Sequence, residues 1–124
     1  TSWNEVLQGA LQAQLRYHVM KENGTERPFT GEYDKHFEPG IYNCADCGIA
    51  LFDSDSKFDS GCGWPAFSNE LENANIEQLI DTSHGMRRIE VRCSNCDSHL
   101  GHLFHEARGP RYCINSICLD FQGE

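Results

Sequence analysis

Residues 111–121 read RYCINSICLDF, and the rest of the chain is organised around this stretch. Apolar residues dominate it, its β-branched isoleucines favour extended backbone, and Gly109-Pro110 and Gly123 mark its two ends. The pattern predicts one continuous strand. Because side chains alternate along a strand, Cys113 and Asn115 then point the same way near its start. Such a pair is compatible with core packing as well as with chemistry, and the other segments decide between the two.

The chain from Thr25 onward favours short strands and tight turns. Apolar and β-branched runs bounded by glycine and proline predict strands at 40–44, 49–52, 87–93 and 100–104. We expect a loop or hairpin region over 53–69, which is rich in Asp, Ser and Gly, and a short helical turn within 71–79. The fold class that follows is mainly β with one N-terminal helix.

Residues 1–24 form the expected helical segment. Ser2 followed by Glu5 matches a capping box, and Asn23-Gly24 supplies a stop signal after the helix fades near Met20. The apolar side of this helix consists of Val6, Ala10, Leu11 and Leu15. We expect that side to cover the sheet as a lid.

Length and composition restrict the class of protein. With 124 residues we expect one domain, in which the helical segment precedes a zinc-containing β core over 25–124. Negative mean hydropathy and the lack of a long apolar run argue against a transmembrane helix. No secretory signal is recognisable, so we expect a cytoplasmic protein; because the chain opens on Thr1, an organelle is the alternative if a segment precedes it. The formal charge of −9 argues against nucleic acid binding.

Two Cys-x-x-Cys units predict a metal site. Two thiolates three positions apart can turn onto one ion, and two such turns complete a tetrahedron. Four thiolates leave no open coordination position, so we expect one structural zinc, in preference to iron, held by Cys44, Cys47, Cys93 and Cys96. A redox Cys-x-x-Cys normally follows a βαβ strand at a helix start, a pattern that this chain lacks, and two disulfides are the other alternative.

The residues after each unit suit the turn that a metal requires. Gly48 favours left-handed backbone, and Asp97 tolerates it. The two units belong to hairpins that are distant in the sequence, so the ion is expected to tie the middle of the sheet together. A closed metal site can supply a large part of the folding stability of a small domain.

Three cysteines remain once the four ligands are set aside. Cys62 lies in a loop with glycine on both sides, which leaves its sulfur unobstructed, and Trp64 either lines a pocket there or packs on the core. Cys118 lies roughly 16 Å beyond Cys113 in a regular strand at ~3.3 Å per residue. A disulfide needs Cα atoms within about 7 Å, so those two cannot pair, and we expect Cys118 to be a small buried hydrophobe.

Two histidines follow the second Cys-x-x-Cys unit directly. His99 and His102 could replace one cysteine pair as zinc ligands, but four thiolates already satisfy the metal. The alternative is that both histidines face a pocket as donors or proton carriers near neutral pH.

These motifs together resemble the methionine-R-sulfoxide reductase B family. The matching segments are GTERPFTGEY (24–33), KFDSGCGWPAF (57–67), DTSHGM (81–86), RCSNCDSHLGHLF (92–104) and RYCINS (111–116). The resemblance covers nearly the whole chain. It implies two antiparallel sheets, zinc in most members, and reduction of the R epimer of methionine sulfoxide in proteins.

The resemblance also implies a role for each matching site residue. Cys113 is the expected nucleophile, and Cys62 resolves the product as a disulfide that thioredoxin reduces. Trp64 cradles the methyl group of the substrate. His99, His102 and Asn115 hold the sulfoxide oxygen and its water network.

The chemistry requires a thiolate opposite hydrogen-bond donors. A sulfoxide sulfur is electrophilic only when its oxygen is protonated or strongly hydrogen-bonded, because the departing oxygen otherwise carries full charge. An ordinary cysteine titrates near ~8.5, so the site must favour thiolate, and Arg111 with a protonated histidine can do this at the substrate pocket. The expected substrates are protein-bound or free methionine sulfoxide, and the expected acting unit is a monomer.

The sequence departs from the family pattern in two places. The segment 105–110 is shorter than the usual loop there, which affects the pocket rim and substrate preference, and Ile117-Cys118 replaces the common Ala-Ser.

Two rival functions are a zinc-ribbon interaction module and a zinc-stabilised chaperone-like binder. Either would use the four-cysteine site as a scaffold and needs neither Cys62 nor Cys113, so thiol reactivity and methionine release distinguish them from a reductase.

Overall fold

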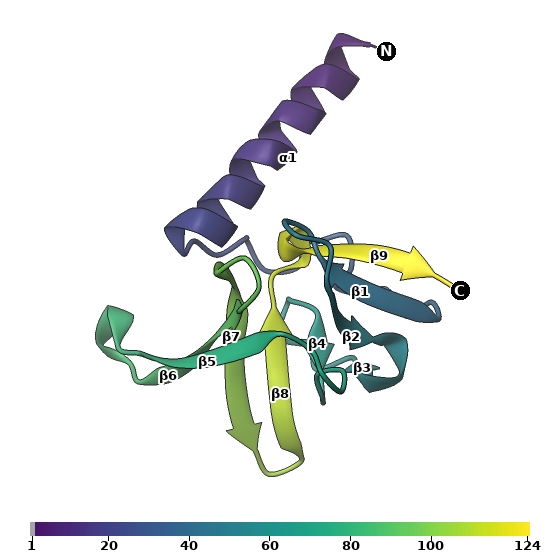
Figure 1. The fold of residues 1–124 in the computed structure, drawn as a ribbon. Helices are drawn as coiled ribbons and strands as arrows, with labels where there is room; N and C mark the ends of the chain where they lie inside the picture. Colours follow the sequence, from purple (N-terminus) through teal and green to yellow (C-terminus); the bar gives the residue numbers. More distant parts are fainter. Residues whose placement is uncertain (1) are drawn as a thin grey trace.

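The computed structural model describes residues 2–124, and within that range the chain forms one long helix and two antiparallel sheets (Figure 1). The helix is α1 (Trp3–Glu22), and the strands are β1 (Gly40–Cys44), β2 (Ala50–Asp53), β3 (Lys57–Phe58), β4 (Ala66–Phe67), β5 (Ile76–Asp81), β6 (Arg88–Cys93), β7 (Ser98–Glu106), β8 (Gly109–Ile114) and β9 (Leu119–Gly123). This confirms the mainly β fold class with two antiparallel sheets. Within residues 2–124, no helix is long and apolar enough to cross a membrane.

The two sheets are built from strands that lie far apart in the sequence. The three-stranded sheet has the order β2-β1-β9, and the six-stranded sheet has the order β3-β4-β8-β7-β6-β5. Aromatic side chains fill the space between them: Phe52 of the first sheet stacks on Phe67 of the second, with ring centroids 4.3 Å apart, and Tyr42 packs edge-on against Phe67. All three rings are fully buried. The core therefore lies where the two sheets meet.

The stretch 111–121 is not one strand, and that prediction is wrong. Strand β8 ends at Ile114, Ser116–Cys118 form a 3₁₀ turn, and β9 then begins in the other sheet. The cause is Glu26, whose carboxylate accepts hydrogen bonds from the backbone N–H groups of Ser116 and Ile117, both at 2.9 Å. Those two N–H groups are therefore not available for strand pairing. The chain turns between β8 and β9, and the predicted alternation of side chains ends there.

Helix α1 begins and ends as predicted but does not act as a lid. The Ser2 hydroxyl accepts from the Glu5 backbone N–H at 3.2 Å, and Asn23 caps the helix in left-handed conformation. The expected apolar side is exposed, with Leu11 57% accessible, whereas the buried residues are Val19 and Met20 in the last turn. The helix leaves the body of the molecule toward its N-terminus (Figure 1), so its first turns have no sheet beneath them.

The remaining secondary-structure predictions are confirmed for the strands and wrong for the helical turn. The strands predicted at 40–44, 49–52, 87–93 and 100–104 are confirmed as β1, β2, β6 and β7, and the region 53–69 contains the short strands β3 and β4. The helical turn predicted within 71–79 is wrong, because Ile76–Asp81 is strand β5. It pairs along the whole length of β6, the next strand in the chain, and that antiparallel ladder overrides the weak local preference.

Candidate active site and metal centre

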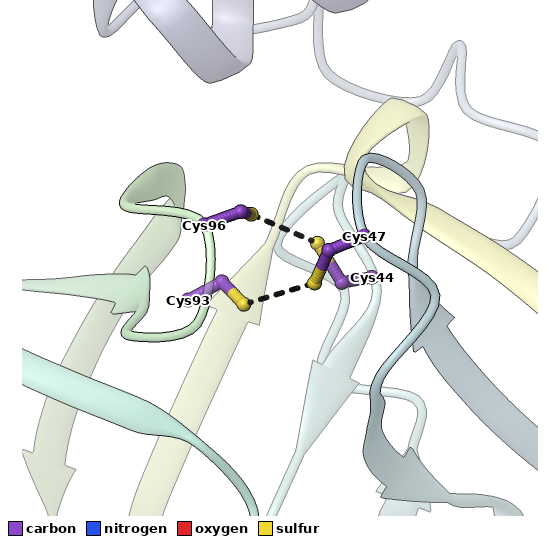
Figure 2. A group of neighbouring side chains, drawn as sticks. All are labelled: Cys44, Cys47, Cys93 and Cys96. Atoms are coloured by element: carbon purple, nitrogen blue, oxygen red, sulfur yellow. Dashed lines mark hydrogen bonds between the residues drawn. The ribbon is translucent and has the colours of Figure 1, made fainter.

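The four cysteines of the two Cys-x-x-Cys units converge (Figure 2). Their sulfurs all lie within 4.8 Å of one another, and the closest approaches are 3.7 Å from Cys44 to Cys96 and 3.6 Å from Cys47 to Cys93. A tetrahedron of thiolates around zinc, with Zn–S of about 2.3 Å, has edges of roughly 3.8 Å. The donor set therefore fits one tetrahedral metal ion.

Each pair of ligands is presented by a tight turn. Gly48 and Asp97 have positive φ, 82° and 59°, as predicted. Their backbone N–H groups donate back to the Cys44 and Cys93 carbonyls at 2.8 and 2.7 Å. One turn joins β1 to β2 and the other joins β6 to β7, so the centre links the two sheets rather than the middle of one sheet.

The end of α1 is attached to the same centre. Lys21 Nζ lies 2.7 Å from Asp46 Oδ2 and 2.8 Å from Ser98 Oγ. Asp46 belongs to the first ligand turn, and Ser98 follows the second. The last turn of the helix thus contacts both sides of the metal centre.

A second pair of sulfurs lies apart from the metal centre. Cys113 on β8 is 9% accessible, and Cys62 reaches it from the loop between β3 and β4, with the two Sγ atoms 3.4 Å apart. The loop is shaped by Gly63, whose φ is 95° and whose carbonyl accepts from the Phe29 backbone N–H at 2.7 Å. This pair is close enough to form a bond after a small movement, since a disulfide measures about 2.0 Å.

The two thiols lie within hydrogen-bond distance of each other. Donation from the Cys113 thiol lowers the pKa of Cys62 to about 5, while its neighbour Cys62, together with burial, raises the pKa of Cys113. The Arg111 guanidinium acts on both in the direction of thiolate. A thiolate on Cys113 is therefore favoured by Arg111 and opposed by burial and by the neighbouring Cys62.

A cavity of about 210 Å³ opens beside this pair. Its lining residues are Thr25, Cys62, Trp64, Arg88, Gly101, His102, Phe104, Arg111, Cys113 and Asn115. The cavity brings together all the predicted catalytic and substrate-binding residues except His99. That histidine is 2% accessible and lies behind His102, with ring centroids 5.5 Å apart.

Three of the lining residues are held by hydrogen bonds. Trp64 Nε1 donates to the Glu26 carbonyl at 3.0 Å. Arg111 donates to both carboxylate oxygens of Glu106, at 2.9 and 3.3 Å. Asn115 Oδ1 accepts from the Glu26 backbone N–H, and Nδ2 donates to the Leu100 carbonyl, both at 3.0 Å. An amide NH₂ has two hydrogens, so one of them remains for a ligand.

The two histidines bond carboxylates rather than a metal. His102 Nε2 lies 2.7 Å from Asp81 Oδ2, and His99 Nδ1 lies 2.6 Å from Glu90 Oε2. Burial lowers the pKa of His99 although Glu90 acts in the opposite direction. The alternative in which histidines replace a cysteine pair at the metal is therefore wrong, because the thiols of the two Cys-x-x-Cys units complete the set themselves.

Reasoning from sequence missed the carboxylates that support this site. Glu26 is 3% accessible, burial raises its pKa, and it bonds the backbone of the 3₁₀ turn after Asn115. Glu26 and Asp81 lie in the segments 24–33 and 81–86 that carry the family resemblance, which was the available signal. Cys118 is fully buried and donates to the His99 carbonyl at 3.3 Å, as expected of a small buried hydrophobe.

Comparison with known proteins gives consistent results. The SelR domain family matches residues 12–123. The peptide methionine sulfoxide reductase MsrB of Chromohalobacter salexigens is 58% identical over 110 residues, which are 86% of this chain and 83% of that protein. The probable methionine-R-sulfoxide reductase B of Caenorhabditis elegans is 51% identical over 127 residues, covering 98% of this chain and 80% of that protein.

A solved structure shares the fold at low sequence similarity. The Mis18 "Yippee-like" domain superposes with a TM-score of 0.57 at 17% identity, over 70% of this chain and 98% of that one. The similarity concerns the architecture alone.

Proposed function

Because this chain belongs to the SelR domain family of methionine-R-sulfoxide reductases B, we propose that Cys113 is its catalytic thiol and Cys62 its resolving thiol. The protein is an oxidoreductase that reduces the R epimer of methionine sulfoxide to methionine. The observation that carries the assignment is the 3.4 Å approach of the two sulfurs at the wall of the cavity. A scaffold for binding alone needs no such pair.

The first half-reaction transfers one oxygen. The Cys113 thiolate attacks the sulfoxide sulfur while the sulfoxide oxygen takes up a proton, and the oxygen ends on Cys113 as a sulfenic acid. The methionine sulfur is reduced by two electrons and leaves as a thioether, and the cysteine sulfur is oxidised by two. The Cys62 thiolate, favoured by its low pKa, then attacks the sulfenic sulfur and forms the disulfide, and the departing hydroxyl takes up a proton from solvent and leaves as water.

Recycling requires an external dithiol. We assign this role to thioredoxin, whose two thiols reduce the Cys62–Cys113 disulfide by exchange and become a disulfide themselves. Cys62 is more accessible than Cys113, which supports approach of a protein reductant from the loop side.

The remaining lining residues suit a methyl sulfoxide. The Trp64 ring supplies an apolar wall for the methyl group, and His102 and Asn115 supply donors for the oxygen, with His99 acting through His102. Arg111 favours the thiolate. In the S epimer the methyl group and the oxygen exchange places, which leaves buried donors unpaired at a cost of ~1–3 kcal/mol each.

We assign zinc to the four-cysteine centre, because a closed set of four thiolates is typical of structural zinc. Bound there, the ion supplies a cross-link between the two sheets and no chemistry on the substrate. A single chain contains both the centre and the cavity, so we assign the activity to a monomer formed of one domain.

The test is an epimer-resolved assay. A methionine sulfoxide peptide of each epimer, and free methionine sulfoxide, are incubated with the protein and dithiothreitol, and methionine is measured. The R peptide should be reduced and the S peptide should not. Comparable turnover of both epimers would contradict the assigned pocket, and no methionine from either would favour a binding module.

A further inference from the structure

Asp81, the last residue of β5, has its carboxylate fully engaged. Its Oδ1 accepts from the Ser83 backbone N–H at 2.9 Å. Its Oδ2 lies 2.7 Å from His102 Nε2 and accepts from Arg88 Nη2 at 3.3 Å. An ionised carboxylate is an acceptor only, so Nε2 of His102 must carry the hydrogen in that contact.

His102 in turn is the strand partner of Cys113 and lines the same cavity. His102 on β7 and Cys113 on β8 are paired residues in the antiparallel ladder, and paired side chains point to the same face. Both line the 210 Å³ cavity, whereas Asp81 lines the neighbouring cavity that also contains His99. Asp81 can therefore influence the reaction through the two side chains that it bonds, His102 and Arg88, both of which line the 210 Å³ cavity.

Several charged groups surround this pair. Arg88 and Glu90 approach from β6, and His99 from β7, with Glu90 already bonded to His99 at 2.6 Å and to Arg92 at 2.7 Å. On the cavity side are the Cys62–Cys113 pair and Arg111. The hydrogen bond to the His102 ring is made by the Asp81 carboxylate and not by any of these surrounding groups.

The carboxylate keeps its charge across the working pH range. Hydrogen bonds from Ser83 and from His102 hold the pKa of Asp81 well below its usual range. The acceptor for Nε2–H is thus present whether or not the second ring nitrogen is protonated. In histidine, the hydrogen bond made by one ring nitrogen determines which nitrogen is available for chemistry.

We propose that Asp81 is a positioning residue of the reductase reaction, which holds the hydrogen of His102 on Nε2 so that protons reach the sulfoxide through Nδ1. The inference rests on the proposed function. In the attack step, the Cys113 thiolate and the Nδ1–H of the imidazolium are consumed together: the proton goes to the sulfoxide oxygen, and the sulfenic acid, methionine and neutral His102 result. Nδ1 then regains a proton from solvent.

The substitution Asp81→Asn tests this role. The amide keeps an oxygen for the Ser83 N–H but presents an NH₂ group to His102 and Arg88, both of which are donors in the present structure. We expect kcat/KM for the R peptide to fall by about 10- to 100-fold, by analogy with the loss of the carboxylate partner of a metal-bound histidine. Glu77 is an exposed carboxylate on the same strand. The control variant Glu77→Gln removes the same charge and should retain full activity.

A direct readout is the ring tautomer of His102. At pH 8, ¹⁵N NMR of the wild-type protein should show the hydrogen on Nε2, and Asp81→Asn should lose that preference while the melting temperature and metal content stay near those of Glu77→Gln. A merely structural role would shift the melting temperature and leave the tautomer unchanged.

The outcomes separate this inference from the proposed function. A folded Asp81→Asn protein with wild-type kcat/KM, or a wild-type His102 with its hydrogen on Nδ1, overturns the role of Asp81. If Asp81→Asn does not fold, the wild-type tautomer decides. Activity of Cys113→Ser would instead overturn the proposed function, whatever Asp81 does.

Discussion

The metal centre and the Cys62–Cys113 pair bring sulfurs together at nearly the same distance, 3.6–3.7 Å in one and 3.4 Å in the other. They differ in how the sulfurs are held. The metal centre is built from two short turns, each of which fixes its own two ligands (Figure 2). The second pair joins a loop cysteine to a strand cysteine at the wall of a cavity. Distance alone does not determine thiol chemistry; the backbone and the neighbours do.

The first consequence of this contrast concerns Cys113. Cys113→Ser should abolish methionine release with thioredoxin and with dithiothreitol, because a hydroxyl is a far weaker nucleophile than a thiolate at neutral pH. Metal content should stay near one ion per chain, since the centre does not involve Cys113. Measurement of both quantities on one preparation separates the two regions. Methionine release by this variant in a single turnover would contradict the role of Cys113 as the nucleophile.

Cys47→Ser should act on the other region. Loss of one ligand removes a cross-link between the two sheets, and structural zinc contributes on the order of 10 kcal/mol of apparent binding free energy that is coupled to folding. We expect loss of zinc together with loss of the cooperative thermal transition, checked by elemental analysis and circular dichroism. A stable, folded and metal-free Cys47→Ser protein would contradict a structural role for the centre.

Cys62→Ser should leave the first half of the catalytic cycle intact and block thioredoxin-driven recycling. The first half-reaction does not need Cys62, so one methionine per chain should be released and a sulfenic acid should accumulate on Cys113. Thioredoxin-driven turnover should fall sharply, whereas dithiothreitol can reach the sulfenic acid directly and should still support turnover. Cys118→Ser is the matched control, since Cys118 is buried away from the cavity. If the control lost thioredoxin-dependent recycling instead, Cys62 would not be the resolving thiol.

The smallest effect is a pH shift. Since the pKa of Cys62 is lowered to about 5, its thiolate is present above that pH and disappears as the pH falls through it. The rate of iodoacetamide alkylation of the Cys62–Cys113 pair should therefore be close to its plateau at pH 7. In Cys113→Ala the hydrogen-bond donor is removed, and the midpoint should rise. A wild-type midpoint near ~8.5, the value of an ordinary cysteine, would contradict the lowered pKa of Cys62.

Different parts of the site were predictable from sequence to different degrees. Spacing alone identified the four cysteines whose sulfurs converge into a set that can hold a metal ion, because a Cys-x-x-Cys turn places its own two sulfurs through local backbone geometry. The resemblance named the cavity residues, and the structure brings Cys62, Trp64, His102, Arg111 and Asn115 together; their roles stay predictions. No local pattern could show that His99 lies behind His102, because residues three positions apart in a regular strand point to opposite faces.

The larger errors came from contacts between distant segments. Residues 111–121 read as one strand because the local sequence contains nothing that stops it; the corner is imposed by Glu26, about ninety positions earlier in the chain. The short helix expected within 71–79 is a strand because β6 pairs with it along its full length. Helix α1 has the predicted caps, but its apolar side is exposed because no part of either sheet lies beneath its first turns.

The sequence by itself determined the two Cys-x-x-Cys units that can hold a metal ion, the ends of α1 and the hairpins around both cysteine turns. Each depends on backbone geometry or residue chemistry within a few positions. Only the tertiary structure decided that β8 and β9 belong to different sheets, that Cys62 meets Cys113, and that Asp81 bonds His102. Those contacts join segments tens of residues apart, where the free energy of packing and pairing outweighs any local preference.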